Sequence, residues 1–302
     1  MIKKTHAWVV SLRLRTLPLA IASTGMGSFL AAGFGVFNLR TCILAALTAI
    51  LLQILSNLAN DYGDFKKGTD NINRVGPQRA LQTGIISVIE MRNAVIFVAV
   101  LTLISGCTLL YFATNGLIAF IVFLVIGLLS IVGAIKYTMG KKPYGYSGWG
   151  DLAVFIFFGV IGVGGTFYLH SHYLHLDIFL PAGSVGFLSA AVLNVNNMRD
   201  INNDEISGKR TLAVILGLKR AKTYHLFLIL VSINRLVRFT FLHVTSNWQW
   251  AFLATIPFFI LHIINIYRSD SAGMDKYLKQ LAIFTLILVL CFGISISMHP
   301  YV

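Results

Sequence analysis

Charged residues are scarce in this sequence, and acidic residues are especially few. Only 12% of the 302 residues are charged, which is about half the fraction found in soluble domains. Asp and Glu together number 11, and cysteine occurs three times. Cys42, Cys107 and Cys291 lie in separate apolar segments without metal-ligand spacing, so we expect them to be small packing residues. No arrangement of Ser, His and Asp, or of Cys and His, indicates a covalent nucleophile.

Long apolar runs, in contrast, are abundant. Hydrophobic residues make up 57% of the chain, and the mean hydropathy is +0.78. A bilayer core of about 30 Å needs roughly 20 apolar residues in a helix. The basic N-terminus lacks a small-residue cleavage site and is interpreted as an uncleaved first helix. We predict one all-α domain over residues 1–302, a polytopic membrane bundle of nine transmembrane helices at about 16–35, 40–60, 93–113, 116–136, 151–170, 178–198, 222–243, 249–267 and 279–298.

The basic residues indicate how these helices are oriented. The net charge is +13, but the Lys and Arg residues lie between apolar runs, which favours membrane topology over nucleic-acid binding. Only Arg40, Arg235 and Arg238 fall outside the N-terminal arm and the connections after the second, fourth, sixth and eighth helices. Cytoplasmic connections carry an excess of Lys and Arg. We therefore expect a cytoplasmic N-terminus in a cell membrane, with the C-terminus outside.

Acidic residues gather on the same side of the membrane, with Asp177 as the exception. Topology does not require this, because Asp and Glu contribute little to it. One acidic cluster ends the second helix, where Asn57, Asp61 and Asp64 share a helix face. Asn60 and Asp64 form an overlapping pair. Polar groups at that depth are costly beside lipid, so we expect them to face a wet cavity lined by protein.

A second cluster ends the sixth helix, with Asn196, Asp200 and Asp204 at intervals of four residues. Gly68 and Gly208 each follow the last Asp of their cluster by four residues. The clusters follow the second and sixth helices, which suggests two repeated four-helix units plus one additional helix. Repeats of this kind often place a binding site at their interface.

The composition of the two clusters is suited to a magnesium and diphosphate site. Mg²⁺ prefers oxygen ligands and is commonly shared between a few carboxylates and substrate phosphates. Two facing carboxylate rows would hold two Mg²⁺ ions and a diphosphate, whereas rows on helices lack the looped geometry of dedicated Ca²⁺ sites. Basic side chains nearby would contact the outer phosphate oxygens, and the candidates are Lys67, Lys141, Lys142, Lys209 and Arg210.

Both clusters resemble the paired aspartate motifs of the UbiA superfamily, the intramembrane aromatic prenyltransferases. The similarity extends over nearly the whole chain, with nine helices and motifs after the second and the sixth. Within the superfamily, the sequence is most similar to the branch that prenylates 1,4-dihydroxy-2-naphthoate in menaquinone biosynthesis. The segments that carry this similarity are residues 11–18, 57–71, 76–77 with 81–84, 142–146 with 150–151, and 208–213.

The resemblance implies a Mg²⁺-assisted transfer of a polyprenyl group from polyprenyl diphosphate to the naphthoate ring. Carbon dioxide and diphosphate would be lost, and the active site would lie on the cytoplasmic side. We expect Asp64 and Asp200 to be the catalytic pair. The expected metal ligands are Asn60, Asp61, Asp64, Asp200 and Asp204. The expected substrate contacts are Asn57, Asp70, Tyr144, Asn196 and Asn197.

One position departs from the superfamily pattern. The general pattern has a third Asp where this chain has Gly68, and the next acid is Asp70. The same departure is associated with the naphthoate branch. It leaves two roles for Asp70, either as a metal ligand or as the partner of a basic residue in the loop.

Two alternative functions share parts of this pattern. A prenyltransferase for another aromatic acceptor, such as 4-hydroxybenzoate or homogentisate, would use the same metal site, although the Gly68–Asp70 spacing and residues 142–146 favour the naphthoate. A secondary transporter would also use intramembrane carboxylates and repeats. Its acids would lie nearer the membrane midplane, whereas here they lie at helix ends on one side. No oligomeric state is indicated.

Several polar residues remain outside this scheme. His170, His172 and His175 lie on the opposite side of the membrane from the acidic clusters, and their spacing resembles a metal cluster only superficially. Asp151 begins the fifth helix, where it is equally suited to an N-terminal helix charge or a site role. Arg235 and Arg238 interrupt the apolar part of the seventh helix, either to reach the interface or to pair within the bundle.

Overall fold

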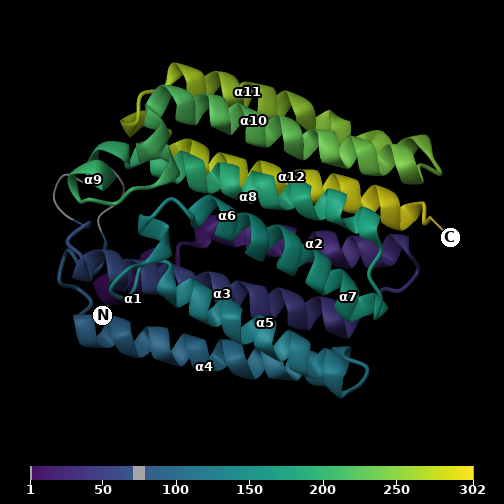
Figure 1. Cartoon of the computed structure of the whole chain (residues 1–302), viewed down its shortest axis with the longest axis horizontal. Helices are drawn as coiled ribbons and strands as arrows, with labels where there is room; N and C mark the ends of the chain where they lie inside the picture. The colour runs from purple at the N-terminus through teal and green to yellow at the C-terminus, as the bar shows by residue number, and fades with distance from the viewer. Residues whose placement is uncertain (1, 71–78, 302) are drawn as a thin grey trace.

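The long helices lie side by side with roughly parallel axes and form a single bundle (Figure 1). The computed structural model describes residues 2–70 and 79–301, and every regular element in those ranges is helical. Nine helical stretches in the described ranges are long and apolar enough to cross a membrane, which confirms the predicted number. The chain is thus a multi-pass membrane protein. Its two termini lie at opposite ends of the bundle (Figure 1), as an odd number of spans requires.

The second and third of the first four spans begin at recognisable capping residues. The Asn38 side chain accepts a hydrogen bond from the Thr41 amide at the start of the second span, and Ser87 and Glu90 form a capping box before the third. Arg13 interrupts the first span with a left-handed φ of 49°. The elements are α1 (Ile2–Leu12), η1 (Leu14–Thr16), α2 (Leu17–Gly33), α3 (Leu39–Lys66), α4 (Val88–Ala113) and α5 (Leu117–Lys136).

The other five spans contain more irregular helix. The fifth includes a π-helical stretch, η3, and the eighth begins with a 3₁₀ stretch, η5. The elements are η2 (Tyr144–Tyr146), α6 (Gly150–Val154), η3 (Phe155–Gly165), α7 (Thr166–Ser171), η4 (Leu176–Ile178), α8 (Phe179–Arg199), α9 (Ile201–Ile206), α10 (Leu212–His243), η5 (Asn247–Thr255), α11 (Ile256–Arg268), η6 (Ala272–Met274) and α12 (Asp275–Met298).

Helix pairings recur between the two halves of the chain. In the first half α3 packs against α2 and α4, and in the second half α8 packs against η3 and α10. In each four-helix unit, the second span (α3 or α8) therefore packs against the first span (α2 or η3) and the third span (α4 or α10). The additional helix, α12, packs against both α2 and α8 and so joins the two halves. The arrangement places α3 and α8, which carry the acidic clusters, in equivalent positions.

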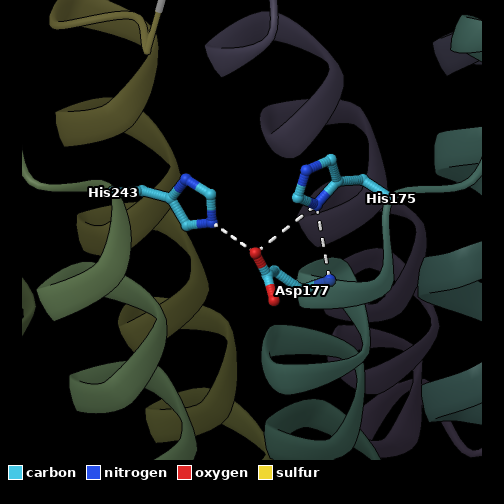
Figure 2. Close-up of side chains that lie close together, drawn as sticks. All are labelled: His175, Asp177 and His243. Atoms are coloured by element: carbon cyan, nitrogen blue, oxygen red, sulfur yellow. Dashed lines mark hydrogen bonds and ion pairs between the residues drawn. The ribbon is translucent and has the colours of Figure 1, made fainter.

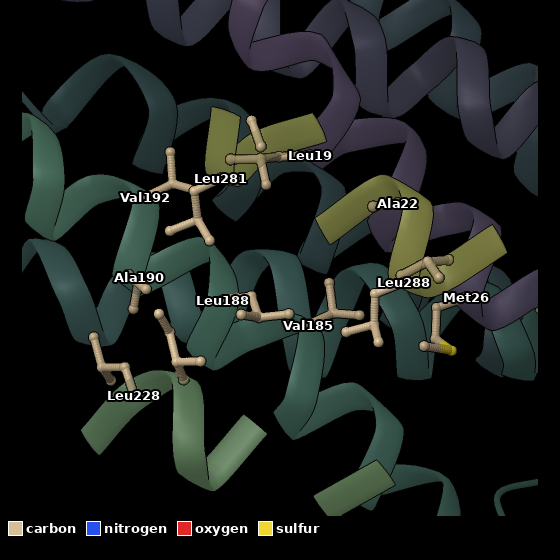
Figure 3. Close-up of a cluster of buried hydrophobic side chains, with 14 of the residues drawn as sticks. Leu19, Ala22, Met26, Val185, Leu188, Ala190, Val192, Leu228, Leu281 and Leu288 are labelled. Atoms are coloured by element: carbon tan, nitrogen blue, oxygen red, sulfur yellow. The ribbon is translucent and has the colours of Figure 1, made fainter. Parts of the chain in front are cut away.

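The main hydrophobic core surrounds α8 (Figure 3). Met26 on α2, Val185 and Leu188 on α8, Leu228 on α10 and Leu288 on α12 are each at most 1% exposed. In a bilayer, close packing rather than removal from water holds helices together. The dense contacts make α8 a rigid support for the second cluster.

Glycines let η3 approach its neighbours closely. A Cβ atom on Gly159 would lie 2.6 Å from the Ala182 carbonyl oxygen, and one on Gly162 would overlap Ser23 Oγ. That hydroxyl donates to the Phe158 carbonyl oxygen at 2.5 Å. The contacts hold η3 against both α2 and α8.

Three helix boundaries differ from the prediction. The N-terminal arm is helical from Ile2 onwards, and α3 continues to Lys66 rather than ending near residue 60. The seventh span begins at Leu212 rather than near residue 222, and it is kinked at Gly217, where φ is 73°. The predicted bounds followed apolar runs, whereas these helix ends carry polar side chains. The first cluster therefore lies inside α3, not beyond it.

Candidate active site

A cavity of about 340 Å³ lies among α2, α3, α4, α5, η3 and α8. Asn60 and Asp64 line it from α3, and Asp200 and Asp204 line it from the end of α8 and from α9. Lys209 lines the same part of the cavity. The two acidic clusters, which are distant in sequence, therefore share one cavity.

The same type of helix ending terminates both clusters. Gly68 and Gly208 follow α3 and α9 with φ values of 72° and 71°. In each case the next amide donates to the carbonyl oxygen of the last Asp of the cluster, which is the Schellman motif and favours glycine. The matching bonds join Thr69 N to Asp64 O at 3.0 Å and Lys209 N to Asp204 O at 2.8 Å. The Asp-to-Gly spacing noted in the sequence therefore reflects helix termination.

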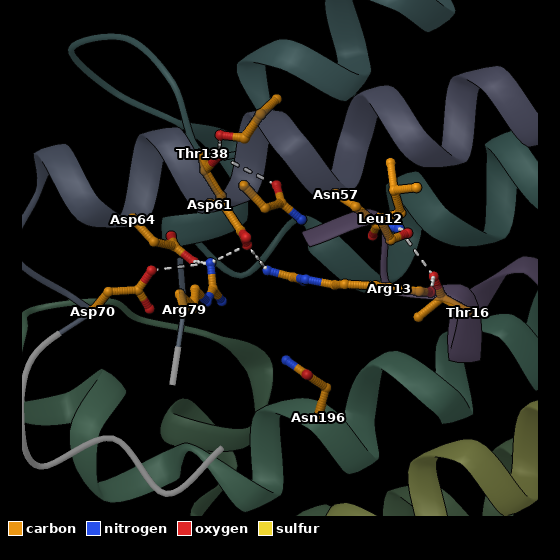
Figure 4. A network of polar contacts seen from close by, with 12 residues as sticks. Leu12, Arg13, Thr16, Asn57, Asp61, Asp64, Asp70, Arg79, Thr138 and Asn196 are labelled. Atoms are coloured by element: carbon orange, nitrogen blue, oxygen red, sulfur yellow. Dashed lines mark hydrogen bonds and ion pairs between the residues drawn. The ribbon is translucent and has the colours of Figure 1, made fainter. Parts of the chain in front are cut away.

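In the first cluster, one guanidinium is surrounded by three carboxylates (Figure 4). Arg79 Nη1 contacts them at three distances, 2.8 Å to Asp61 Oδ1, 3.1 Å to Asp70 Oδ2 and 3.3 Å to Asp64 Oδ2. Arg13, in the left-handed turn after α1, also pairs with Asp61. Asp61 does not line the cavity. It is a buried partner of two arginines, so the structure does not support its predicted place among the metal ligands.

In the second cluster, Arg199 fixes the position of Asp200. Its Nε and Nη2 atoms bond to the two carboxylate oxygens of Asp200 at 2.9 and 2.5 Å. The same guanidinium reaches Asn196 Oδ1 at 3.0 Å and Asp275 Oδ1 at 2.6 Å. Arg199 is 2% exposed, so Asp200 is held rigidly by a bidentate, charge-assisted contact.

The predicted helical row through this cluster is interrupted. Asp200 separates α8 from α9 and has φ and ψ of −92° and 7°. Helical hydrogen bonding continues across the break, with Asp200 N to Asn196 O at 3.2 Å and Asp204 N to Asp200 O at 2.8 Å. The spacing of four residues is preserved for this reason, and all three side chains line the cavity.

Direct contacts join the two clusters. Tyr146 Oη hydrogen-bonds with Asp64 Oδ1 at 2.9 Å, and Lys209 Nζ lies 5.2 Å from the centre of the Tyr146 ring. Asn203 Nδ2 donates to the Thr69 carbonyl oxygen at 2.8 Å. The segment after each Schellman ending is thus fixed against the other cluster.

The buried cations remain charged at this end of the cavity. Lys209 Nζ lies 3.7 Å from Asp204 Oδ1. Burial alone would lower the pKa of Lys209, but Asp64, Asp204 and Asp200 outweigh burial and raise it. The pKa of Arg79 is raised in the same way, with burial opposed by the surrounding carboxylates. Burial raises the pKa of Asp204 to about 7, and Lys209 opposes that shift.

The oxygen atoms in the cavity fit a divalent cation. Asp204 Oδ2 and Asn203 Oδ1 are buried and accept no hydrogen bond from the described residues, and both residues line the cavity. Buried polar atoms without partners are uncommon and costly. Asn60, Asp64 and Asp200 add further oxygen atoms to the same end. Carboxylate and amide oxygens are the ligands that Mg²⁺ prefers, so the donor set is suited to it.

Four of the five predicted substrate contacts line the cavity, namely Asn57, Asp70, Tyr144 and Asn196. Asn197 is buried and does not line it. Asn57 Nδ2 already donates to the Leu12 carbonyl oxygen at 2.9 Å and to Thr16 Oγ1 at 3.1 Å, so it ties α3 to the turn before α2. Asp70 pairs with Arg79. Of its two expected roles, this contact matches that of a partner for a basic residue.

Among the five predicted diphosphate-binding residues, only Lys209 lines the cavity. Lys67, Lys141, Lys142 and Arg210 are exposed. The reason is local. Lys209 follows the glycine of its Schellman ending and is turned back towards the carboxylates. Lys67 precedes the corresponding glycine and points outwards, with Nζ 5.4 Å from the centre of the Tyr146 ring.

The sequence-based site predictions missed several residues in or beside the cavity, among them Arg13, Arg79, Tyr146 and Asn203. The two arginines had been considered only for membrane orientation, although the acidic clusters require nearby buried cations. Tyr146 belongs to the segment 142–146 that carries the family resemblance, and Asn203 directly precedes a predicted ligand. The segment 76–77, which contains Gly76 and Pro77, lies outside the described residues.

Away from the acidic end, the cavity walls are largely apolar. The lining includes Leu52 on α3, Leu103 and Leu110 on α4, Phe157 on η3 and Leu169 on α7. Because Leu110 and Leu169 lie near the far ends of their helices, the cavity extends from the acidic clusters towards the opposite membrane face. A largely apolar part of the cavity therefore continues from its charged end.

Comparison with known proteins agrees with these features. The model of the UbiA prenyltransferase family matches residues 20–288. A protein from Escherichia coli K12, named 1,4-dihydroxy-2-naphthoate octaprenyltransferase, is 44% identical over 99% of this chain and 98% of its own length. A protein of the same name from Haemophilus influenzae is 40% identical over 97% of this chain and 96% of its own.

Solved structures share the fold. A UbiA homologue from Aeropyrum pernix K1 in its apo form superposes with a TM-score of 0.68 at 17% identity, over 95% of this chain and 98% of its own. A UbiA homologue from Archaeoglobus fulgidus, bound to GPP and Mg²⁺, superposes with a TM-score of 0.63 at 16% identity, over 94% and 99% of the two chains. The match of the family model and the full-length relatives show that this chain belongs to the UbiA prenyltransferase family.

Proposed function

We propose that this protein transfers a polyprenyl group from polyprenyl diphosphate to 1,4-dihydroxy-2-naphthoate. A carbon–oxygen bond of the diphosphate ester breaks, a carbon–carbon bond forms at the ring carbon that bears the carboxylate, and CO₂ and diphosphate leave. The product of this step is demethylmenaquinol, the reduced form of demethylmenaquinone, because no oxidant takes part. The observation that carries this proposal is the meeting of two carboxylate clusters at the charged end of an otherwise apolar cavity. The naphthoate acceptor is supported by the name shared by the relatives at 44% and 40% identity.

Mg²⁺ would be held at the charged end of the cavity. We assign its ligands to Asn60 and Asp64 from the first cluster and to Asp200 and Asp204 from the second, and we propose two ions. Asp204 Oδ2, which accepts no hydrogen bond from the part of the chain that the structure describes, supports this assignment. The two hydrogen bonds from Arg199 that fix the Asp200 carboxylate support it too. When bound, Mg²⁺ would neutralise negative charge on the diphosphate leaving group.

Buried cations of the chain would bind the diphosphate directly. Lys209 and Arg79 line the acidic end and remain charged, and Arg13 lies beside them. Fixed positive groups aimed at a leaving diphosphate stabilise the charge that develops on it. Lys67, Lys141, Lys142 and Arg210 are exposed, so we assign them no contact with the diphosphate.

The rest of the cavity would receive the hydrocarbon part of the substrate. Its walls are built from leucine, isoleucine and phenylalanine side chains between α3, α4 and η3. Such a lining keeps water away from a reactive allylic carbon. Tyr144 and Tyr137 line the cavity near its charged end, where the aromatic acceptor would stack. Their position favours attack by a ring on the carbon next to the diphosphate.

We further propose that the charged end faces the cytoplasm. The proposal follows from the excess of Lys and Arg in the connections on that side, and it places the N-terminus in the cytoplasm too. One catalytic domain over residues 1–302 is the simplest organisation, because helices of both halves line the same cavity.

Acceptor specificity gives the direct test of this function. Purified protein in detergent, with Mg²⁺ and octaprenyl diphosphate, is supplied with either 1,4-dihydroxy-2-naphthoate or 4-hydroxybenzoate. We expect prenylated product and released CO₂ only with the first acceptor, and chromatography of the quinone product provides the measurement. Faster product formation from 4-hydroxybenzoate would instead identify the protein as a prenyltransferase for that acceptor.

A further inference from the structure

Three metal-binding side chains converge at the end of the molecule opposite the carboxylate cavity (Figure 2). His175 and Asp177 lie at the start of η4, and His243 is the last residue of α10. His243 Nε2 lies 3.1 Å from Asp177 Oδ2, and His175 Nδ1 lies 3.6 Å from the same oxygen. One ligand atom from each residue falls within 4.8 Å of the other two. The fold thus brings together two segments that are far apart in sequence.

The ion-pair partners of the Asp177 carboxylate are imidazoles. Within the described residues, its ion-pair contacts are the two imidazoles, and neither Lys nor Arg reaches it. The side chains of His175, Asp177 and His243 are 42%, 37% and 17% exposed. An ion from solution can therefore reach these three side chains, and its positive charge would stabilise the Asp177 carboxylate.

The hydrogen bond that His175 Nδ1 accepts is long. The Asp177 amide approaches this nitrogen at 3.4 Å, with Nδ1 as the acceptor, and Asp177 Oδ2 lies 3.6 Å from the same nitrogen. The single lone pair of Nδ1 would bind a cation in place of the amide. A cation between Nδ1 and Oδ2 would therefore replace one weak hydrogen bond with two metal–ligand contacts.

We propose that His175, Asp177 and His243 bind a divalent transition-metal ion of the Zn²⁺ class. Imidazole nitrogen and carboxylate oxygen are its usual ligands, at about 2.0–2.2 Å. Ligand atoms around a tetrahedral ion of that size are separated by about 3.4 Å, between the observed 3.1 and 3.6 Å. Three protein ligands leave a fourth position for water.

The bound ion would join the start of α8 to the end of α10. Aromatic rings pack around the site. The ring centroid of Phe34 lies 5.5 Å from that of His175 and 5.9 Å from that of His243. The ring centroid of Tyr301 lies 5.3 Å from that of His243. An ion that binds only the folded form stabilises it. Zn²⁺ should therefore raise the melting temperature of the protein.

Zinc titration of the full chain tests this site. Tag-free protein in detergent, with millimolar Mg²⁺ present to occupy the carboxylate cavity, is titrated with Zn²⁺ by calorimetry. We compare the wild type with His175→Gln, His243→Gln and the control His172→Gln, an exposed histidine of the same connection. We expect one site that weakens more than about 10-fold in the first two variants and is unchanged in the control. The Zn²⁺-induced rise in melting temperature should follow the same pattern.

Two outcomes would overturn the metal site. One is wild-type protein that binds Zn²⁺ no more tightly than His243→Gln does. The other is a Co²⁺ complex of the wild type without the visible absorption of tetrahedral nitrogen and oxygen ligation. None of the three residues lines the catalytic cavity, so prenyl transfer should persist in every variant and reports on folding. If one variant does not fold, the other variant and the Co²⁺ spectrum decide.

Discussion

Replacement of Asp64 with asparagine is expected to lower prenyl transfer by roughly 10²–10³-fold, the loss found when one preorganised charge-stabilising group is removed from an active site. Asp64 lies at the centre of the arrangement, because it contacts Arg79 and Tyr146 and is close enough to Lys209 to raise the pKa of that lysine. Asparagine keeps the shape of the side chain but removes the negative charge that a divalent ion requires. Steady-state kinetics with octaprenyl diphosphate provides the measurement.

Glu205→Gln is the matched control for this variant. Glu205 adjoins Asp204, is exposed and does not line the cavity. The same chemical change should therefore leave turnover within about twofold, because a solvated surface charge contributes little. Unchanged gel filtration of Asp64→Asn would show that its fold is intact. Turnover near the wild-type rate in folded Asp64→Asn would remove Asp64 from the metal site.

Removal of divalent cations is expected to abolish turnover. The acidic end holds five carboxylates, and its arginines and lysine are already paired with them. A diphosphate entering that space without further positive charge would meet strong repulsion. Treatment with excess EDTA should therefore lower the rate by at least about 100-fold. Added Mg²⁺ should restore it.

EDTA already saturated with Mg²⁺ controls for effects of the chelator on detergent or protein and should leave the rate unchanged. Ca²⁺ should restore the activity poorly, because it takes longer bonds of about 2.3–2.6 Å and more ligands than Mg²⁺. Full activity after exhaustive chelation would mean that Lys209, Arg79 and Arg13 stabilise the leaving group without a metal.

The position of the site could be predicted from the sequence because its signals are local. Apolar runs of about 20 residues define spans, and acids four residues apart lie on one helix face. That reasoning placed Asp64 and Asp204 at helix ends, and the structure brings them to one cavity. It grouped Asp61 with the metal ligands because Asp61 shares the helix face of Asn57, whereas the structure pairs the Asp61 carboxylate with two arginines.

The positions of the basic side chains in the site depend on backbone turns, which a hydropathy pattern does not predict. Lys67 and Lys209 each adjoin the glycine that follows an acidic cluster, but Lys67 precedes its glycine and is exposed, whereas Lys209 follows its left-handed glycine and lines the cavity. Arg13 reaches Asp61 because its own backbone is left-handed, a conformation that few non-glycine residues adopt. The sequence also carried no sign that His175 and His243 lie close together. His243 is on another span, and both histidines contact Asp177 Oδ2 only in the folded bundle.

Anomalous diffraction tests most directly whether α3 and α8 together form one metal and diphosphate site. Crystals would be grown with Mn²⁺ in place of Mg²⁺ and with a polyprenyl thiolodiphosphate that cannot be cleaved. We predict anomalous peaks between Asp64 on one side and Asp200 and Asp204 on the other, with the diphosphate between the two clusters. Manganese bound by only one cluster, or a diphosphate outside the cavity, would contradict a shared site.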